Sequence, residues 1–289
     1  MTYELKKIAI VGAGGKMGMR ISNNLQHSRY NVAYCENSPR AREQIIAAGR
    51  ELAVTDEVVA HADVVILAVP DVALETVSGF VVPQMKNGAI LLTLDPAASY
   101  AGLLAQRDGI HQAVAHPCHP SVFLERTTKE EYADAFGGNA AIQDVCAAFE
   151  SGNDKQRSEL AEIIGVMYGP VGEVHWVTVK QLAYLEPTLV ETVACMVGSF
   201  MKEALDETIN RIGVPEAAAK AMLYGHIQIA LAVAFRSTNP FSDACLIAID
   251  YGREQIIKPD WKKIFDEKEL DLIIARMLKI DAVRKADAA

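Results

Sequence analysis

Seven residues, GAGGKMG at positions 12–18, constrain the fold of this chain more than any other stretch. They follow the apolar run KIAIV, which is typical of a buried strand, and lead into KMGMRISNNLQ, which is typical of a helix. Glycine is needed where a chain turns tightly and where backbone amides must approach a phosphate group. The pattern therefore predicts a strand, a glycine turn and a helix whose N-terminus binds the pyrophosphate of a dinucleotide.

The glycines are spaced as GxxGxxG, with Gly14 as an additional glycine. An ordinary turn between a strand and a helix is the alternative interpretation, and the surrounding pattern favours the dinucleotide site. The residues that we expect to contact the cofactor in this turn are Gly12, Gly14, Gly15, Lys16, Met17 and Gly18.

Glu36 ends the second predicted strand, 18 residues after Gly18. A carboxylate at that place accepts hydrogen bonds from the adenosine ribose and repels a 2′-phosphate, which favours NAD over NADP. Arg40 and Arg42 lie nearby and argue for the opposite preference. After the next strand we expect the second half of the cofactor to pass Val69, Pro70 and Asp71, although a simple strand end is the alternative there.

Short apolar runs alternate with helical segments as far as residue 177, which predicts a doubly wound parallel sheet of the Rossmann type. The predicted strands are residues 7–12, 31–36, 63–70, 89–95 and 113–118. Two further strands, within residues 139–149 and 173–179, enclose another helix at the far edge of the sheet. We therefore predict an NAD-binding domain over residues 1–177 and an all-α domain for substrate binding and dimerisation over residues 178–289.

The second half shows helical spacing, with one helix over residues 179–211 that we expect to bend near Pro187, and another that begins at Pro215. Both are apolar around most of their circumference. Helices of this kind are buried in a bundle or in an interface between subunits, so we expect a homodimer.

The formal net charge of −9 is spread along the chain without a basic cluster, which argues against nucleic acid as a partner. Five cysteines that are far apart and include no CxxC pair indicate reduced thiols in the cytoplasm. The longest apolar stretches contain charged residues or histidine, so we expect no segment that crosses a membrane. The expected partner is a small-molecule substrate.

The stretch AHPCHPSVF at residues 115–123 follows a strand, and ligands of α/β sheets bind at the carboxyl ends of strands. His116 and His119 both precede proline, which favours an extended conformation for each. In a polyproline helix such residues are separated by roughly 9 Å, so one metal ion would bind both only if the loop curls. The alternative is that both histidines stabilise a rigid loop through hydrogen bonds.

Two polar residues, Glu191 and His226, interrupt the apolar helices of the second half. We expect each to be buried beside a counter-charge, a metal ion or the substrate, although helix caps or dimer contacts would also satisfy them. Glu186 is a further acidic candidate, but on an ideal α-helix it would diverge from Glu191 by about 140°. Lys180 is interpreted as a solvated residue.

Together these features resemble the superfamily of 6-phosphogluconate, 3-hydroxyacid and prephenate dehydrogenases and ketol-acid reductoisomerase. The stretches AHPCHPSVF, YLEPTLVET and GHIQIALAVAF look like the branch of the D-apionate oxidoisomerases. The resemblance implies NAD-dependent oxidation of a branched sugar acid at carbon 2 and a carbon shift that gives 3-oxo-isoapionate. It further implies that His116, His119, Glu191 and His226 serve catalysis, with His116 and Glu191 as ligands of a divalent metal.

The spaced acidic metal ligands of reductoisomerases are not reproduced here, so zinc or a similar ion is favoured over magnesium. A simple NAD-dependent dehydrogenase of a sugar acid or 3-hydroxy acid, without rearrangement, is the first alternative. An NAD-binding sensor without catalysis is the second, and the polar residues expected between the domains argue against it.

Overall fold

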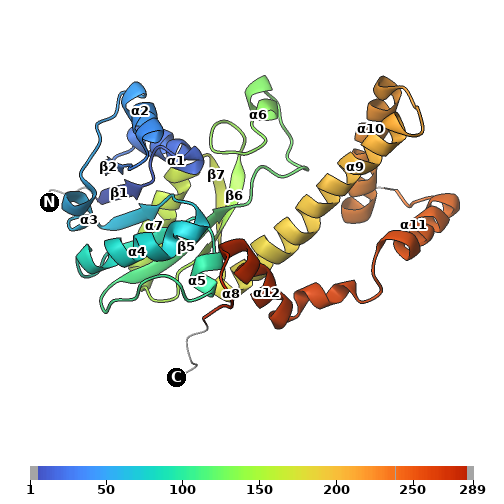
Figure 1. Ribbon diagram of the computed structural model, residues 1–289. Helices are drawn as coiled ribbons and strands as arrows, with labels where there is room; N and C mark the ends of the chain where they lie inside the picture. The colour runs from blue at the N-terminus through green and yellow to red at the C-terminus, as the bar shows by residue number, and fades with distance from the viewer. Residues whose placement is uncertain (1–5, 238, 285–289) are drawn as a thin grey trace. The chain divides into compact units, whose positions relative to one another are not determined.

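A computed structural model describes residues 6–237 and 239–284 of the chain (Figure 1). The chain divides into two compact units, one containing residues 6–186 and 271–284, the other Pro187–Leu270. This division falls later than the boundary predicted after Val177. Helix α8 (Val179–Ala183) packs against the sheet of the first unit. Near the other end of the chain, the Arg284 amide donates to the Ala101 carbonyl of the same unit.

The first unit contains one seven-stranded sheet in the order β2-β1-β3-β4-β5-β6-β7, and all seven strands predicted from the sequence are present. Their bounds are β1 Lys7–Val11, β2 Asn31–Cys35, β3 Val64–Leu67, β4 Ile90–Thr93, β5 His111–Pro117, β6 Gln143–Ala148 and β7 Val171–Trp176. β2 lies on one side of β1 and β3 on the other, so the direction in which successive strands are added to the sheet reverses between β1 and β3. Such a switch point is where α/β sheets bind their ligands.

Helices cover both faces of the sheet, which is why the central strands are apolar on both sides. On one face Ile8, Ile66 and Leu92 pack against α1 and α7, while on the other Val114 and Ala148 pack against Leu182 of α8. Besides α8, the helices of this unit are α1 Lys16–Gln26, α2 Pro39–Ala47, α3 Thr55–Val59, η1 Asp71–Ala73, α4 Leu74–Val81, η2 Val82–Gln84, α5 Ala97–Tyr100, α6 Lys129–Ala133 and α7 Asp154–Met167.

The predicted parallel sheet needs one correction, because β6 runs antiparallel to β5. The connection between them contains only the short helix α6 and does not cross back over the sheet. As a result β6 starts at the edge where β5 ends. The unit β6-α7-β7 then restores parallel pairing between β6 and β7.

The second unit is helical, and its first element continues directly from α8. The predicted long helix is present as α8, the π-helix η3 (Tyr184–Cys195) and α9 (Met196–Asn210). Pro187 lies inside η3, where its missing amide prevents regular α-helical bonding. The other helices of this unit are α10 Glu216–Arg236, α11 Asp243–Ile256 and η4 Trp261–Phe265. The last helix, α12 Glu267–Leu278, begins in this unit and belongs to the first unit from Asp271 onward.

The single chain leaves α9, α10 and α11 largely exposed instead of burying them in a bundle, and their expected burial in an interface between subunits stays a prediction. Helix α10 is largely exposed, and apolar side chains such as Met222 (65% exposed) and Phe235 (73% exposed) face solvent. The sequence also predicted that no apolar run would be long enough to cross a membrane, and α10 differs from that prediction. By length and composition alone α10 would suffice to cross a membrane, with a mean hydropathy of 1.3 over its most apolar window.

Candidate functional site

The glycine turn lies between β1 and α1, as predicted, and three of its glycines are required by the packing of the protein itself. A Cβ atom on Gly14 would lie 2.3 Å from the Ala41 carbonyl oxygen, and one on Gly18 would lie 2.0 Å from the Gly12 oxygen. Gly12 itself has a positive φ of 84°. These glycines let the turn, α1 and α2 approach each other closely.

Gly15 differs from its neighbours, because a Cβ there would meet no described atom closer than 3.4 Å. It is the N-cap of α1 and makes no side-chain hydrogen bond to the first helical turn. The amides of Lys16 and Met17 therefore open the helix without a protein cap. This combination of space, backbone donors and the positive end of the helix dipole fits the pyrophosphate of a dinucleotide.

Glu36 lies directly after β2 and fixes the shape of the cofactor turn. Its carboxylate accepts hydrogen bonds from the Gly14 amide at 3.0 Å and from the amides of Asn37 and Ser38. A cavity of about 650 Å³ brings Glu36 together with Gly12 and Val69, both predicted contacts of the cofactor. A carboxylate has about four acceptor positions and three are used here, so Glu36 keeps capacity for one ribose hydroxyl.

Val69 and Pro70 lie between β3 and η1 on the other side of the switch point, and Asp71 is the first residue of η1. Burial and the neighbouring charge of Asp95 raise the pKa of Asp71 to about 6. Asp71 thus carries its negative charge less readily than an exposed aspartate.

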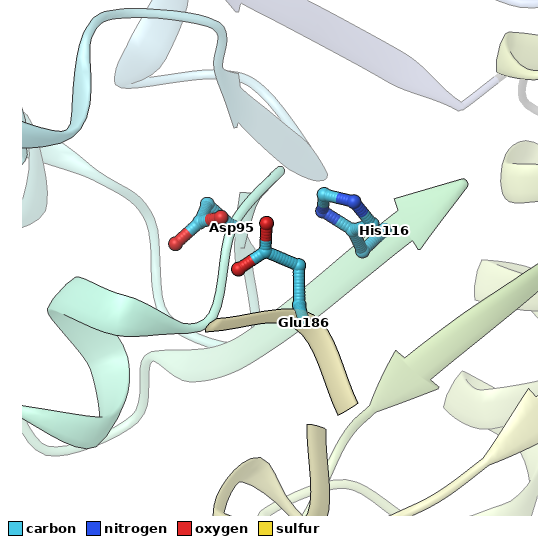
Figure 2. Close-up of side chains that lie close together, drawn as sticks. All are labelled: Asp95, His116 and Glu186. Atoms are coloured by element: carbon cyan, nitrogen blue, oxygen red, sulfur yellow. The ribbon is translucent and has the colours of Figure 1, made fainter. Parts of the chain in front are cut away.

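Three side chains, Asp95, His116 and Glu186, converge at the carboxyl ends of β4 and β5. One ligand atom from each lies within 4.8 Å of the others, and Figure 2 shows the Glu186 carboxylate between Asp95 and the imidazole. Asp95 follows β4, and His116 belongs to β5. Glu186 lies near the start of η3, the π-helix that continues α8. Because two neighbouring carboxylates repel, a divalent cation between them fits this arrangement.

The hydrogen bonding of His116 supports a role as a ligand. Its Nδ1 lies 3.0 Å from the Leu94 carbonyl oxygen, so Nδ1 carries the proton and Nε2 keeps its lone pair. Burial lowers the pKa of His116 to about 4, against the raising effect of the Leu94 carbonyl. Metal-binding histidines commonly donate their other ring nitrogen to a carbonyl in this way.

His119 lies close to His116, with a ring-centroid distance of 6.5 Å, but it does not belong to the cluster of three. Its φ of 61° is left-handed, so the predicted extended conformation is wrong for this residue, whereas His116 is extended in β5. The Nδ1 of His119 lies 2.9 Å from the Phe136 carbonyl oxygen. That contact holds the residue in a conformation that its position before Pro120 disfavours.

Glu191 and His226 lie in the second unit, and both are exposed in the single chain. Their expected burial, which contacts in a dimer would also provide, stays a prediction. The Nδ1 of His226 lies 2.8 Å from the Met222 carbonyl oxygen, one helical turn back.

Lys180 is exposed in α8, in keeping with its interpretation as a solvated residue.

Asp95 was not predicted as a site residue, and Glu186 was only a further acidic candidate, expected to diverge from Glu191 on an ideal helix. One signal for Asp95 was available, because it directly follows a buried strand adjacent to β5. No local pattern signals Glu186, whose position depends on α8 packing against β6.

Comparison with known proteins gives two family matches that together span most of the chain. The NADPH-binding domain of acetohydroxy acid isomeroreductase matches residues 3–143. The C-terminal domain of decarboxylating phosphogluconate dehydrogenase matches residues 124–278. The first match covers the sheet up to β6, and the second covers the rest of the sheet and the helices.

Relatives match over nearly the whole length. A D-apionate oxidoisomerase of Pectobacterium atrosepticum is 75% identical over 285 residues, covering 99% of this chain and 100% of the relative. One from Cupriavidus necator is 40% identical, covering 94% of this chain and 99% of the relative.

A solved structure supports the same relationship. It is a semialdehyde dehydrogenase NAD-binding protein from Cupriavidus necator in complex with calcium and NAD. It has a TM-score of 0.91 and 39% identity, and the match covers 95% of this chain and 100% of that chain. With its glycine turn, Rossmann-type sheet and helical second half, this NAD-dependent oxidoreductase belongs to the family of the D-apionate oxidoisomerases.

Proposed function

We propose that this enzyme oxidises D-apionate at carbon 2 with NAD⁺ and rearranges the carbon skeleton to 3-oxo-isoapionate. The observation that carries the proposal is the convergence of Asp95, His116 and Glu186 at the strand ends. A simple dehydrogenase needs only a hydride acceptor and a base. A carbon shift also needs a Lewis acid for the ketone and the neighbouring hydroxyl, and this cluster fits a divalent cation.

The proposed ligands are the carboxylates of Asp95 and Glu186 and the Nε2 atom of His116. When bound, the cation would polarise the carbonyl oxygen and acidify the adjacent hydroxyl group. Carboxylate oxygens suit manganese and magnesium, whereas imidazole suits zinc and other transition metals, so we favour Mn²⁺ or Zn²⁺. Calcium accompanies NAD in the Cupriavidus necator structure, which supports the binding of a divalent cation by this chain too.

His119 is the proposed general base. Its Nδ1 points at the Phe136 carbonyl, which leaves Nε2 as the basic nitrogen. The hydroxyl proton of the substrate would move to this nitrogen while NAD⁺ accepts the hydride from carbon 2. The proposed contacts of NAD⁺ are the glycine turn, Glu36 and the residues Val69–Asp71, and the acidic Glu36 favours NAD over NADP.

The test is turnover of D-apionate and of linear aldonic acids by purified protein with NAD⁺, with and without a chelator. We expect NADH formation with D-apionate and a rearranged product, and loss of the rearrangement after chelation. Faster turnover of a linear acid would overturn the substrate assignment.

A dehydrogenase without rearrangement is the second candidate, favoured by the match to phosphogluconate dehydrogenase in the C-terminal half. Full activity after exhaustive chelation, with an unrearranged oxo acid as product, would establish it. An NAD-binding sensor predicts cofactor binding with turnover of no hydroxy acid in the same assay.

We also propose that a second copy of the chain covers the second unit, and that the protein acts in the cytoplasm, where its five free thiols would stay reduced. The argument for the homodimer is the exposed apolar surface of α9, α10 and α11, which includes Phe200, Met222, Ile229, Ile247 and Tyr251. Light scattering should give twice the chain mass, and Ile229→Asp should shift it toward the monomer.

Glu191 and His226 stay predictions as catalytic residues, and Glu191 as a metal ligand. Burial by the second copy would place both in the apolar surroundings that the sequence suggests. Glu191→Gln and His226→Asn should then lower kcat in the dimer; unchanged kinetics for both variants would remove them from the site.

A further inference from the structure

Phe136 contacts Lys16 of the glycine turn and also His119, the proposed base. It lies between α6 and β6, on the loop that follows His119 along the chain. Its ring centroid lies 4.9 Å from the Lys16 Nζ atom and 5.2 Å from the Arg20 Cζ atom. Two cations from the first turns of α1 therefore contact one aromatic ring.

The same residue contacts the proposed base in two ways. The His119 ring meets the Phe136 ring edge-on, with a centroid distance of 5.6 Å and an interplanar angle of 89°. The Phe136 carbonyl oxygen lies 2.9 Å from the His119 Nδ1 atom. The backbone of Phe136 thus sets which nitrogen of His119 is basic, while its ring limits how the imidazole turns.

The segment that carries Phe136 is firmly attached to α1. Arg20 donates to the Gly137 carbonyl at 2.9 Å, and the Asn24 amide donates to the Gly138 carbonyl at 3.1 Å. The buried Asp134 carboxylate accepts three backbone amides from residues 139–141, which closes the segment into a compact turn. Phe136 remains 52% exposed, so contacts with its neighbours, and not burial of an apolar core, fix its position.

We propose that Phe136 is a positioning residue that links the cofactor turn to the base, by orienting Lys16 for the cofactor phosphates and His119 for the substrate hydroxyl. The inference has two halves. The His119 half, which concerns the orientation of the base, rests on the proposed function, whereas the Lys16 half concerns only the binding of NAD⁺. Each half has its own readout, so the inference and the proposed function fail separately.

The first test is direct titration of NAD⁺ against Phe136→Leu, with no sugar acid present. Leucine keeps an apolar side chain and the backbone carbonyl but removes the aromatic face, so we expect the Kd for NAD⁺ to rise about fivefold. Phe136→Tyr keeps the face and should restore most of the affinity. Tyr132→Leu is the matched control, because Tyr132 is a 67% exposed aromatic residue of α6 nearby, and its Kd should not change.

A double-mutant cycle with Lys16→Met separates positioning from general damage to the fold. In the Lys16→Met background the Phe136→Leu change should raise the Kd by no more than about twofold, because one of the two cations is already gone. An equal fold-change in both backgrounds, or an unchanged Kd in Phe136→Leu, would overturn the Lys16 half. Phe136→Met serves as a second apolar variant if Phe136→Leu lowers the melting temperature.

The His119 half is measured as a split between kcat and KM. At saturating NAD⁺, Phe136→Leu should lower kcat for D-apionate about threefold to tenfold, with little change in the KM for the sugar acid. Phe136→Tyr should recover most of that loss. A kcat that is unchanged, or that Tyr fails to restore, would overturn this half even if NAD⁺ binding responds as expected.

Discussion

The cofactor turn and the cluster of Asp95, His116 and Glu186 lie in the same unit and are built in opposite ways. The turn is one continuous stretch, and what it offers to a cofactor is backbone amides and the absence of side chains at its glycines. The cluster takes one side chain from each of three distant segments and brings two carboxylates together. The turn should therefore fail on added atoms, whereas the cluster should tolerate small changes of volume and fail on lost charge.

The two regions also differ in how their neighbours support them. The shape of the turn is set by close backbone contacts with β3 and α2, and by Glu36. In the cluster, the Leu94 carbonyl orients His116, and Asp95 accepts the Ala97 amide at the start of α5.

The largest effect should come from removing one charge from the cluster. Glu186→Gln keeps the shape of the buried side chain but removes a ligand, and we expect kcat to fall about 10³-fold because several kcal/mol of Lewis-acid stabilisation are lost. The Kd for NAD⁺ should stay within about twofold. A large loss of NAD⁺ affinity in this variant would show that the two regions are not separable.

Two alanine substitutions in the turn should give opposite results. Gly15→Ala adds a methyl group to open space, so unfolding in urea should show little change, while the Kd for NAD⁺ rises by about tenfold to a hundredfold. Gly18→Ala forces a contact with a backbone oxygen and should lower the free energy of unfolding by about 1–3 kcal/mol. Equal loss of stability in both variants would contradict the different roles assigned to these glycines.

Glu36→Ala should weaken NAD⁺ binding about tenfold and reduce the discrimination against NADP⁺. The reason is twofold, since the carboxylate is proposed to contact the ribose and also holds the Gly14 amide. Glu43→Ala, an exposed glutamate of α2, is the control. Unchanged affinity in Glu36→Ala would remove Glu36 from the cofactor site.

The smallest effect on turnover should come from Asp134, which supports the segment that carries Phe136. Burial raises its pKa, but hydrogen bonds from the amides of residues 139–141 outweigh burial and hold the pKa below the ordinary value of 3.8. A lowered pKa in the folded state stabilises the protein above that ordinary value, and the stabilisation is lost as pH falls through the folded-state pKa.

Asp134→Ala should therefore cost about 1–3 kcal/mol in the free energy of unfolding at pH 7, because three amides lose their acceptor. Urea unfolding at decreasing pH should show the difference from the unmodified protein shrinking below about pH 4. Asp134→Asn, which keeps one acceptor oxygen, should lose less. A difference that stays constant down to pH 3 would contradict the role of the ionised carboxylate.

The contrast between the regions also explains what the sequence could predict. Gly12–Gly18 is readable because its glycines and the strand and helix that flank them are contiguous in sequence, and most of the strands are readable because they are short apolar runs. Glu186 could not be assigned to the cluster, because its position depends on the packing of α8 and on the π-helix around Pro187. The exposure of Glu191 and His226 was missed because an apolar helix has the same pattern whether its own chain or a second copy covers it.

The most direct test of the account is a crystal of the complex with NAD⁺ and Mn²⁺, with the ion located by its anomalous scattering. The account predicts one peak within ligand distance of the Asp95 and Glu186 carboxylates and of the His116 Nε2 atom, with the pyrophosphate of NAD⁺ at the amides of the glycine turn. A peak held by other residues, or an enzyme that rearranges D-apionate after every divalent cation has been removed, would contradict it.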